Sequence, residues 1–375
     1  MDAKRTPSRR RGKPIRLLDE EVAFIGVDVH KKTYSVCVYT EERGIVTTWI
    51  QPPDPAGFAA RLEPVRAQVA WVVYEAGPTG YGLARHLRAS DFPVDVVAPS
   101  KTPAPRTRSG KGDRRDAKDL ARLAAKDMLT PIYVPTVEQE ADRQVARRRE
   151  QLARHVRQVK HRIKSFLLQH GLPGFSEWTL EAIKRLRTLP LCPQLRFCLD
   201  SQLAELDHAQ AQLKAAEREV ARLARSERHA AVVEALRRVP GVGVVTAMAV
   251  RTELLEPERF TGSAQVASFT GLAPCVRRSG DRTRSGPILK TGSRSLRRLL
   301  VQAAWQWKKR DPVAGKLFSR LLRATASSQK AIVGVARRLA ILLWRILTGR
   351  IEYRLDRAPE EARPPEPEPA AAATP

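Results

Sequence analysis

Short runs of alternating hydrophobic and polar residues dominate the first third of the chain. Three of them follow one another, VAFIGVDV (22–29), TYSVCVYT (33–40) and GIVTTWIQ (44–51), joined by short polar turns. Their content of Val, Ile, Thr and aromatic residues is typical of β-strands. Two later runs, WVVYEA (71–76) and PVDVVAPS (93–100), predict a fourth and a fifth strand.

Helical patterns separate and follow these last strands. AGFAARLEPVRAQ precedes the fourth strand, GYGLARHLRAS follows it, and a third helix begins near Asp113, after the Pro-, Gly- and Lys/Arg-rich loop KTPAPRTRSGKG. The order βββαβαβα over residues 21–135 predicts a mixed sheet covered by helices, which is the plan of an RNase H-like nuclease fold.

The pattern changes to charged and helical over residues 136–236. Apolar residues there recur at spacings of three and four, as at Val156, Val159, Ile163, Phe166 and Leu167. This spacing predicts an antiparallel helical hairpin or coiled coil that serves as a linker, with a plain pair of solvated helices as the alternative.

The remaining segments differ in composition. Residues 237–352 combine Gly-rich, Gly/Ser/Arg-rich and Leu/Arg-rich stretches, which predict a mostly helical C-terminal domain. Residues 1–20 are expected to form a basic, disordered arm. Residues 353–375 form a Pro/Glu/Ala tail with too little apolar content to fold.

The net charge of the chain indicates what kind of partner it binds. The 375 residues include 67 Lys and Arg against 40 Asp and Glu, a formal net charge of +27, which favours nucleic acid. An anionic membrane is the competing partner, but no apolar run approaches the roughly 20 residues of a spanning helix. AILLWRIL (340–347) is short and broken by Arg345, so a basic amphipathic surface helix is the remaining alternative there. The four cysteines show no pairing or zinc-finger spacing and predict reduced thiols in a cytosolic protein.

Several acidic residues lie at strand and helix ends, where they are candidates for metal ligands. Asp28 interrupts the apolar first strand, where a carboxylate is costly without a partner, and Glu75 ends the fourth. Asp113 and Asp116 open the third helix on one face, and Asp119 lies further round it. Four acids, Asp28, Glu75, Asp113 and Asp116, could thus converge at the carboxyl ends of the sheet and bind a divalent cation. The alternative is that Asp113 is a helix N-cap and the others are surface ion-pair partners.

Oxygen-only ligands favour Mg²⁺, with Mn²⁺ possible, over Zn²⁺. Two such ions would stabilise the attacking and leaving oxygens of phosphoryl transfer, while the surrounding Lys and Arg hold a nucleic-acid backbone. His30, Lys31 and Lys32 are candidates for phosphate contact near the metal, or else they are solvent-facing turn residues.

Two basic, glycine-containing stretches follow in the C-terminal domain. LRRVPGVGVVTAMAV is typical of a helix-hairpin-helix element, in which Gly241 and Gly243 let backbone N–H groups approach a phosphate; a plain turn between helices is the alternative. Ser279 is a candidate nucleophile, because Arg side chains around it could stabilise charge on an attacked phosphate. The alternative is a phosphate-binding turn without catalysis. The basic candidates in this second stretch are Arg277, Arg278, Arg282, Arg284, Lys290 and Arg297.

Taken together, five motifs resemble the DEDD transposase family of insertion sequences (insertion-sequence family one-hundred-ten), which is related to the pilin-gene inverting recombinases. The motifs run in the family's order: F-I-G-V-D-x-x-K from 24, Y-E-A-x-x-T-G-Y at 74–81, K-x-D-x-x-D-A-x-x-L-A at 111–121, P-G-V-G-x-x-T-A at 240–247, and F-x-G-L-x-P with S-G and K-x-G-x-x-x-L-R-R at 269–298. One departure is Gly112, where the family usually has Thr or Ser.

The resemblance implies an RNase H-like N-terminal domain, a coiled-coil linker and a C-terminal transposase domain. It implies a four-acid metal site at Asp28, Glu75, Asp113 and Asp116, and a serine, Ser279, that forms a covalent phosphoserine link to DNA. It also implies homo-oligomers, dimers or tetramers, in which acids and serine from different subunits complete one site. An element-encoded structured guide RNA would pair with target and donor DNA.

The expected function is therefore that of a Mg²⁺-dependent, serine-using DNA recombinase that excises and inserts its own element, guided by RNA, at the cytoplasmic nucleoid. Two alternatives stay open. One is a junction-resolving nuclease in which water attacks, and the other is a non-catalytic nucleic-acid-binding protein whose acids are structural.

Overall fold

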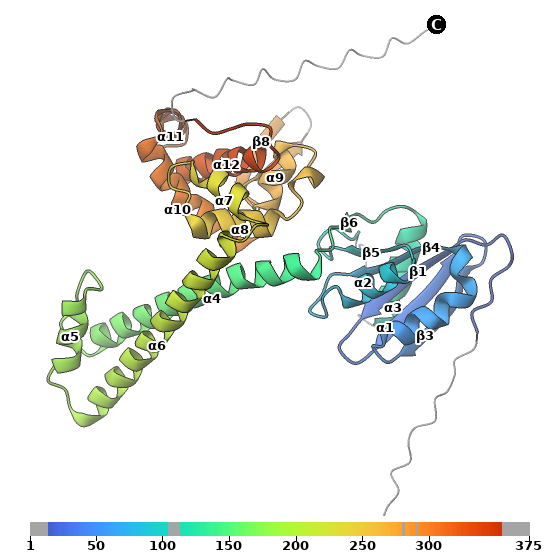
Figure 1. Ribbon diagram of the computed structural model, residues 1–375, viewed down its shortest axis with the longest axis horizontal. Coiled ribbons are helices and arrows are strands. Elements are labelled where there is room, and N and C mark those ends of the chain that lie inside the picture. Colours follow the sequence, from blue (N-terminus) through green and yellow to red (C-terminus); the bar gives the residue numbers. More distant parts are fainter. Residues whose placement is uncertain (1–13, 104–112, 280–281, 290–291, 355–375) are drawn as a thin grey trace, which may run out of the picture. The chain divides into compact units, whose positions relative to one another are not determined.

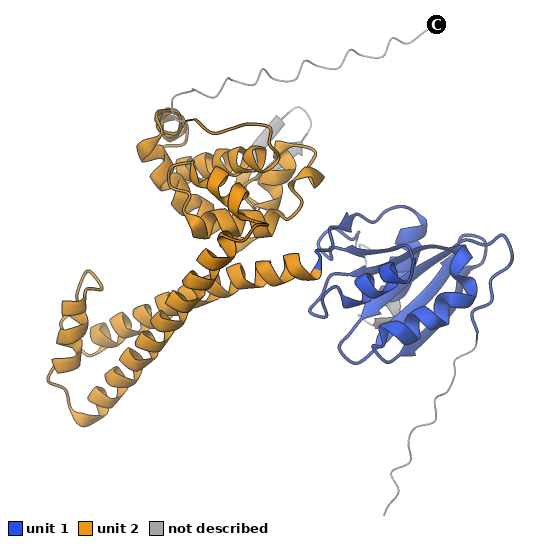
Figure 2. Ribbon diagram, viewed as in Figure 1, with its two compact units in different colours: residues 1–136 blue, residues 137–375 orange. Residues whose placement is uncertain are grey.

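The computed structural model describes residues 14–103, 113–279, 282–289 and 292–354. The chain divides into two compact units, residues 1–136 and 137–375, shown in different colours in Figure 2. Each unit is described by itself.

A six-stranded mixed sheet forms the first unit, in the order β3-β2-β1-β4-β5-β6 (Figure 1). The strands are β1 (Ala23–Val29), β2 (Tyr34–Thr40), β3 (Gly44–Gln51), β4 (Val69–Glu75), β5 (Val94–Val97) and β6 (Pro131–Ile132). β1, β2 and β3 pair antiparallel, β4 and β5 extend β1 in parallel, and β6 closes the edge antiparallel to β5. The five predicted strands are confirmed, whereas the two-residue β6 was not foreseen.

Helices cover both faces of this sheet. α1 (Pro55–Leu62) and α2 (Gly82–Ala89) pack Phe58, Leu62 and Leu83 into one core cluster with Ile25, Val27 and other residues of the same sheet face. The sequence predicts one helix over 56–68, but Pro64 removes a backbone donor, and the chain continues beyond α1 as the 3₁₀ helix η1 (Glu63–Gln68). Ile15 is buried in the same cluster, so it belongs to the folded unit and not to the predicted arm.

The opposite face of the sheet is covered by α3 (Asp113–Ala125). Its residues Ala117 and Ala121 bury Cys37 of β2, and Leu120 and Ala124 pack on β4 and β5. Burial raises the pKa of the Cys37 thiol to about 11, which suits an inert structural cysteine.

The second unit begins with two long antiparallel helices, α4 (Val137–Gln169) and α6 (Pro193–Ala224), joined through the short α5 (Leu180–Thr188). Their direction follows from their ion pairs, since Arg149 pairs with Glu217 and Arg162 with Glu205. The apolar seam contains Val156, Val159, Ile163 and Leu167 of α4 and Leu199, Leu203 and Leu206 of α6. The hairpin agrees with the predicted pattern, and the connection between its two long helices contains α5.

The rest of the second unit is a helical bundle with a β-ribbon. Its elements are α7 (Ala230–Arg237), α8 (Val244–Leu254), η2 (Pro257–Arg259), α9 (Ser263–Phe269), β7 (Pro274–Ser279), β8 (Arg282–Ile288), α10 (Arg294–Arg310), α11 (Pro312–Thr325) and α12 (Ser328–Leu347). The basic stretch expected to be a loop is thus an antiparallel ribbon. α12 buries Ile341, Leu343 and Trp344 in the core, so the idea of a membrane-surface helix at 340–347 is wrong. No helix in the described part of the chain has the length and apolar content of a membrane span.

Candidate functional site

Two acidic residues end neighbouring parallel strands of the first unit. β1 and β4 pair in parallel with Gly26 beside Val73 and Val27 beside Tyr74. Asp28 and Glu75 follow this last pair directly, each at or beside the end of its strand. Backbones of paired strands lie about 4.8 Å apart. This pairing agrees with the predicted meeting of the two acids at the carboxyl edge of the sheet, which stays a prediction.

Both acids also belong to the face that α3 covers. Gly26 touches α3 so closely that a Cβ atom there would lie 2.1 Å from the Ala117 carbonyl oxygen and 2.5 Å from the Ala121 nitrogen. Val73 packs with Leu120 of the same helix. Because side chains alternate along a strand, Asp28 and Glu75, each two residues further on, lie on this same face.

The direction of α3 brings its acidic end toward this edge. Leu123, near the end of the helix, packs against the same apolar cluster as Phe24 and Trp71, which lie near the starts of β1 and β4. The first turn, with Asp113 and Asp116, therefore extends toward the ends of the strands. The Asp116 side chain is exposed. For Asp113 only the helical backbone is described, and its side chain lies outside the described part.

The partners of the acids differ. The Asp28 carboxylate is 18% exposed, and its Oδ2 lies 3.0 Å from Nε2 of His30 in the β1–β2 turn. Glu75 is half-buried, and its carboxylate has no hydrogen bond or ion pair with any residue that the structure describes. Among the described side chains no three His, Cys, Asp or Glu gather closely enough to hold a metal ion. Asp28 and Glu75 thus lie at the ends of adjacent strands, and the convergence of the four acids on one site stays a prediction.

The other candidate residues near this edge have different surroundings. His30 contacts Asp28, a pairing that the sequence analysis missed, although an acid and a histidine two residues apart at a turn could have suggested it. Lys31 and Lys32 are exposed. Oδ1 of Asp119 lies 3.9 Å from Nη1 of Arg122 in a surface i,i+3 ion pair. This agrees with the expectation that Asp119 is a weaker candidate for a metal ligand than Asp113 and Asp116.

The two glycines of the α7–α8 turn have different surroundings. Gly241 has a φ of +88°, and a Cβ there would lie 2.6 Å from the Ala303 carbonyl oxygen of α10. Its conformation and this close approach give Gly241 a packing role, and the predicted contact of its backbone with phosphate stays a prediction. At Gly243, which precedes the first turn of α8, no described atom lies within 4 Å of the Cβ position. Of the two, Gly243 leaves room for a ligand.

Ser279 is the last residue of β7. It pairs with Arg282 across the ribbon, and Arg278 pairs with Thr283 and Arg277 with Arg284. The side chains of residues 276–279 and 282–285, and the whole of Lys290, lie outside the described part. Arg297 donates a hydrogen bond of 3.4 Å to the Gly271 carbonyl near the base of the ribbon, so it has a structural partner besides its predicted role.

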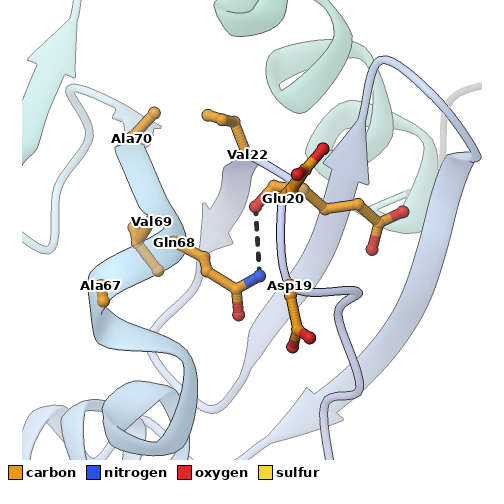
Figure 3. A pocket seen from close by; sticks show the side chains of 8 residues that line it. Asp19, Glu20, Val22, Ala67, Gln68, Val69 and Ala70 are labelled. Carbon is orange, nitrogen blue, oxygen red and sulfur yellow. Dashed lines mark hydrogen bonds between the residues drawn. The ribbon is translucent and has the colours of Figure 1, made fainter.

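A surface pocket of about 270 Å³ lies elsewhere in the first unit (Figure 3). It lies before β1 and β4, at the opposite end of these strands from Asp28 and Glu75. Asp19 and Glu20 line it, and Gln68 donates a hydrogen bond of 3.3 Å to the Glu21 carbonyl. Arg43 donates hydrogen bonds to the Glu21 carboxylate and lowers its pKa. This acidic, internally paired pocket does not suit a phosphate ligand.

Both units match known families. Residues 25–171 match a DEDD family described as "Transposase", and residues 233–319 match the "Transposase IS116/IS110/IS902 family". "Putative transposase y4qE" of Sinorhizobium fredii is 32% identical over 342 residues, 88% of this chain and 83% of that protein. The transposase for insertion sequence element IS1111A of Coxiella burnetii is 25% identical over 345 residues, 89% of this chain and 92% of its own length. The transposase for IS1533 of Leptospira borgpetersenii is 28% identical over 323 residues, 83% of this chain and 91% of its own.

The mixed α/β unit with paired strand-end acids and the largely helical second unit fit a protein of the transposase class. The chain belongs to the IS110 family of DEDD transposases. The resemblance of its motifs to that family is therefore confirmed, and with it a general role in DNA binding, cleavage and rejoining for an insertion sequence.

Proposed function

We propose that this protein excises and inserts an insertion sequence by divalent-metal-assisted phosphoryl transfer, with Ser279 as nucleophile. The observation that carries the proposal is the position of Asp28 and Glu75 at the ends of adjacent parallel strands, on the face covered by α3. The strand order β3-β2-β1-β4-β5, with helices on both faces, supports an RNase H-like plan for this unit.

The acids of the first unit suit a hard divalent cation. Two carboxylates on neighbouring strands repel each other. His30 contacts the Asp28 carboxylate, whereas the Glu75 carboxylate has no hydrogen bond or ion pair with a described residue. Asp28, Glu75, Asp113 and Asp116 would hold Mg²⁺, or Mn²⁺ in its place. When bound, the metal would supply Lewis-acid polarisation of the phosphate and of the attacking hydroxyl.

Ser279 would form the covalent link. Its Oγ–P bond forms as one P–O bond of the DNA backbone breaks, the hydroxyl proton leaves to a base, and the departing oxygen takes up a proton. Ser279 ends β7 and pairs with Arg282 across the ribbon, and Arg277 pairs with Arg284 two positions further along it. Guanidinium groups in this segment would stabilise charge growing on the phosphate. We further propose, from the family resemblance, a structured guide RNA and a dimer or tetramer as the working assembly.

The test combines the protein and its native RNA with element-end DNA and Mg²⁺, followed by denaturing electrophoresis. Wild type is expected to yield a protein–DNA adduct, and Ser279→Ala none. Ser285→Ala, in the partner strand of the same ribbon, is the matched control and should retain the adduct. Asp28→Asn or EDTA should abolish it.

Two results would contradict the proposal. An equal adduct in Ser279→Ala would move the nucleophile to another residue. Strand cleavage by wild type without any adduct would identify water as the nucleophile, and the protein would then act as a nuclease of the junction-resolving kind.

A further inference from the structure

Positive charge is distributed unevenly over the second unit. The segment 294–350, which spans α10, α11 and α12, contains 14 Lys and Arg and a single acid, Asp311. In the α4–α6 hairpin, by contrast, several cations are paired with acids, as in Arg187–Asp207, Arg196–Asp200 and Arg222–Glu219. Positive charge is therefore balanced by acids to a greater extent in the hairpin than in the segment 294–350.

Asp311 does not neutralise any of these cations. It is buried at the start of α11, and its Oδ1 accepts from the backbone nitrogens of Val313 (2.7 Å) and Ala314 (3.1 Å). Its Oδ2 accepts from Trp307 Nε1 (2.8 Å) and Tyr353 OH (2.6 Å). The only acid of the segment is thus fully used as a helix cap and an internal anchor.

α11 concentrates the unneutralised charge on its exposed side. Its apolar side, with Ala314, Leu317 and Leu321, packs into the core. The opposite side exposes Lys316, Arg320 and Arg323, here called the α11 stripe, together with Ser319. Spacings of four and three residues align the three cations within about 60° of the helix circumference. No member of the stripe has an ion pair with a residue of the described part.

Such a stripe is unfavourable for the isolated fold, because like charges at i,i+3 and i,i+4 repel. A polyanion would relieve that repulsion. The stripe extends about 10 Å along the helix, enough to meet several phosphates of a nucleic acid. It exposes no aromatic ring for stacking on unpaired bases, since Phe318 lies beneath Lys308, whose Nζ is 3.6 Å from the ring centroid. A duplex backbone therefore fits better than a single strand.

We propose that the α11 stripe binds the phosphate backbone of duplex DNA without reading base sequence. The choice of DNA over RNA rests on the proposed DNA recombination. The stripe would hold the DNA flanking the reacting phosphate, as a grip separate from Ser279 and the acids. Arg320 and Arg323 lie beyond residue 319, where the match to the second family ends.

The test measures binding of the full chain to a fluorescent random duplex of about 30 base pairs in EDTA, by anisotropy between about 50 and 200 mM NaCl. Each lost phosphate contact lowers the slope of log affinity against log salt by about 0.9. The triple variant K316Q/R320Q/R323Q should lose about 2 to 3 units of slope and roughly tenfold or more in affinity. Gln is compatible with these exposed helical positions.

Two control variants separate the stripe from total charge. R185Q/R187Q/R222Q removes the same net charge from ion-paired surface positions of the hairpin and should leave the slope nearly unchanged. K316R/R320K/R323K keeps the charges of the stripe and should bind like wild type. Circular dichroism melts establish that all variants are folded.

The proposal would be overturned if K316Q/R320Q/R323Q kept the DNA affinity and salt slope of wild type, or if R185Q/R187Q/R222Q lost as much of both. A loss confined to a parallel duplex-RNA arm would assign the stripe to RNA and overturn the DNA assignment. Because the assay needs neither metal nor catalysis, its outcome does not depend on the proposed serine chemistry. Failure of the proposed chemistry and failure of the stripe are therefore separate results.

Discussion

At the scale of single residues, Gly26 determines how closely α3 approaches the sheet. Any side chain at this position would meet the backbone of Ala117 and Ala121, which cannot move without the whole helix. The residue lies two positions before Asp28, and its contact on α3 lies one turn after Asp113. A shift of α3 would therefore move the acidic helix end relative to the strand-end acids.

Replacement of Gly26 by Ala should destabilise the first unit by about 1–3 kcal/mol, because overpacking forces the helix and sheet apart. DNA cleavage should fall further than stability, since the acids would be displaced. Thermal unfolding and adduct formation measure the two effects. Gly82→Ala is the matched control, because a Cβ there meets no described atom within 4 Å and Ala favours helix, so it should be neutral or stabilising. A stable, fully active Gly26→Ala would refute the close-contact argument.

Sequence reasoning reached some residues of the candidate site and not others. Asp28 and Glu75 were found because a carboxylate inside or at the end of an apolar strand breaks the pattern. The pairing of His30 with Asp28 depends on the turn conformation, which the pattern does not contain. The packing of Gly241 against α10 was not foreseen, because its contacts come from residues about 60 positions away.

At the scale of elements, ion pairs with buried carboxylates connect α4 to the helical bundle. Glu150 of α4 is buried and accepts from Arg149 at 2.7 Å and from Arg298 of α10. Arg147 of α4 donates to Glu253 of α8 at 2.8 Å. Losing one partner of such a pair costs more than the pair contributes, because the remaining charge is left buried.

Glu150→Ala should therefore lower the free energy of unfolding of the second unit by about 2–4 kcal/mol. Glu181→Ala, which removes an exposed i,i+4 partner of Arg185, should change it by no more than about 0.5 kcal/mol. Urea unfolding followed by circular dichroism compares the two variants. Similar small effects from both would mean that Glu150 does not fasten the hairpin.

The elements themselves were predictable where periodicity was strong. β1 to β5 follow from period-two patterns, and α4 and α6 from apolar residues three and four apart. The β7–β8 ribbon was missed because its Arg, Ser and Gly residues carry little strand preference, and its pairing is with itself. α5 could have been found, since Thr179 accepts a hydrogen bond from Ala182 and is a recognisable N-cap.

At the scale of the whole molecule, the acids and the serine belong to different units of the chain, residues 1–136 and 137–375. The proposed assembly completes each site with the acids of one subunit and the serine of another. Chemistry would then require an oligomer, and a defect in either unit could be offset by an intact copy of that unit in a neighbour.

Mixed oligomers of Asp28→Asn and Ser279→Ala subunits should therefore recover adduct formation that neither variant shows alone. In a mixed dimer, one site would combine the intact acids of the Ser279→Ala subunit with the intact serine of the Asp28→Asn subunit. Random mixing would restore about a quarter of the wild-type adduct. Asp28→Asn mixed with Glu75→Gln is the matched control, because both defects lie in the first unit and no site regains both acids. Co-purification through two different tags establishes that mixed oligomers are present. If they form and stay inactive, each site is built within a single subunit.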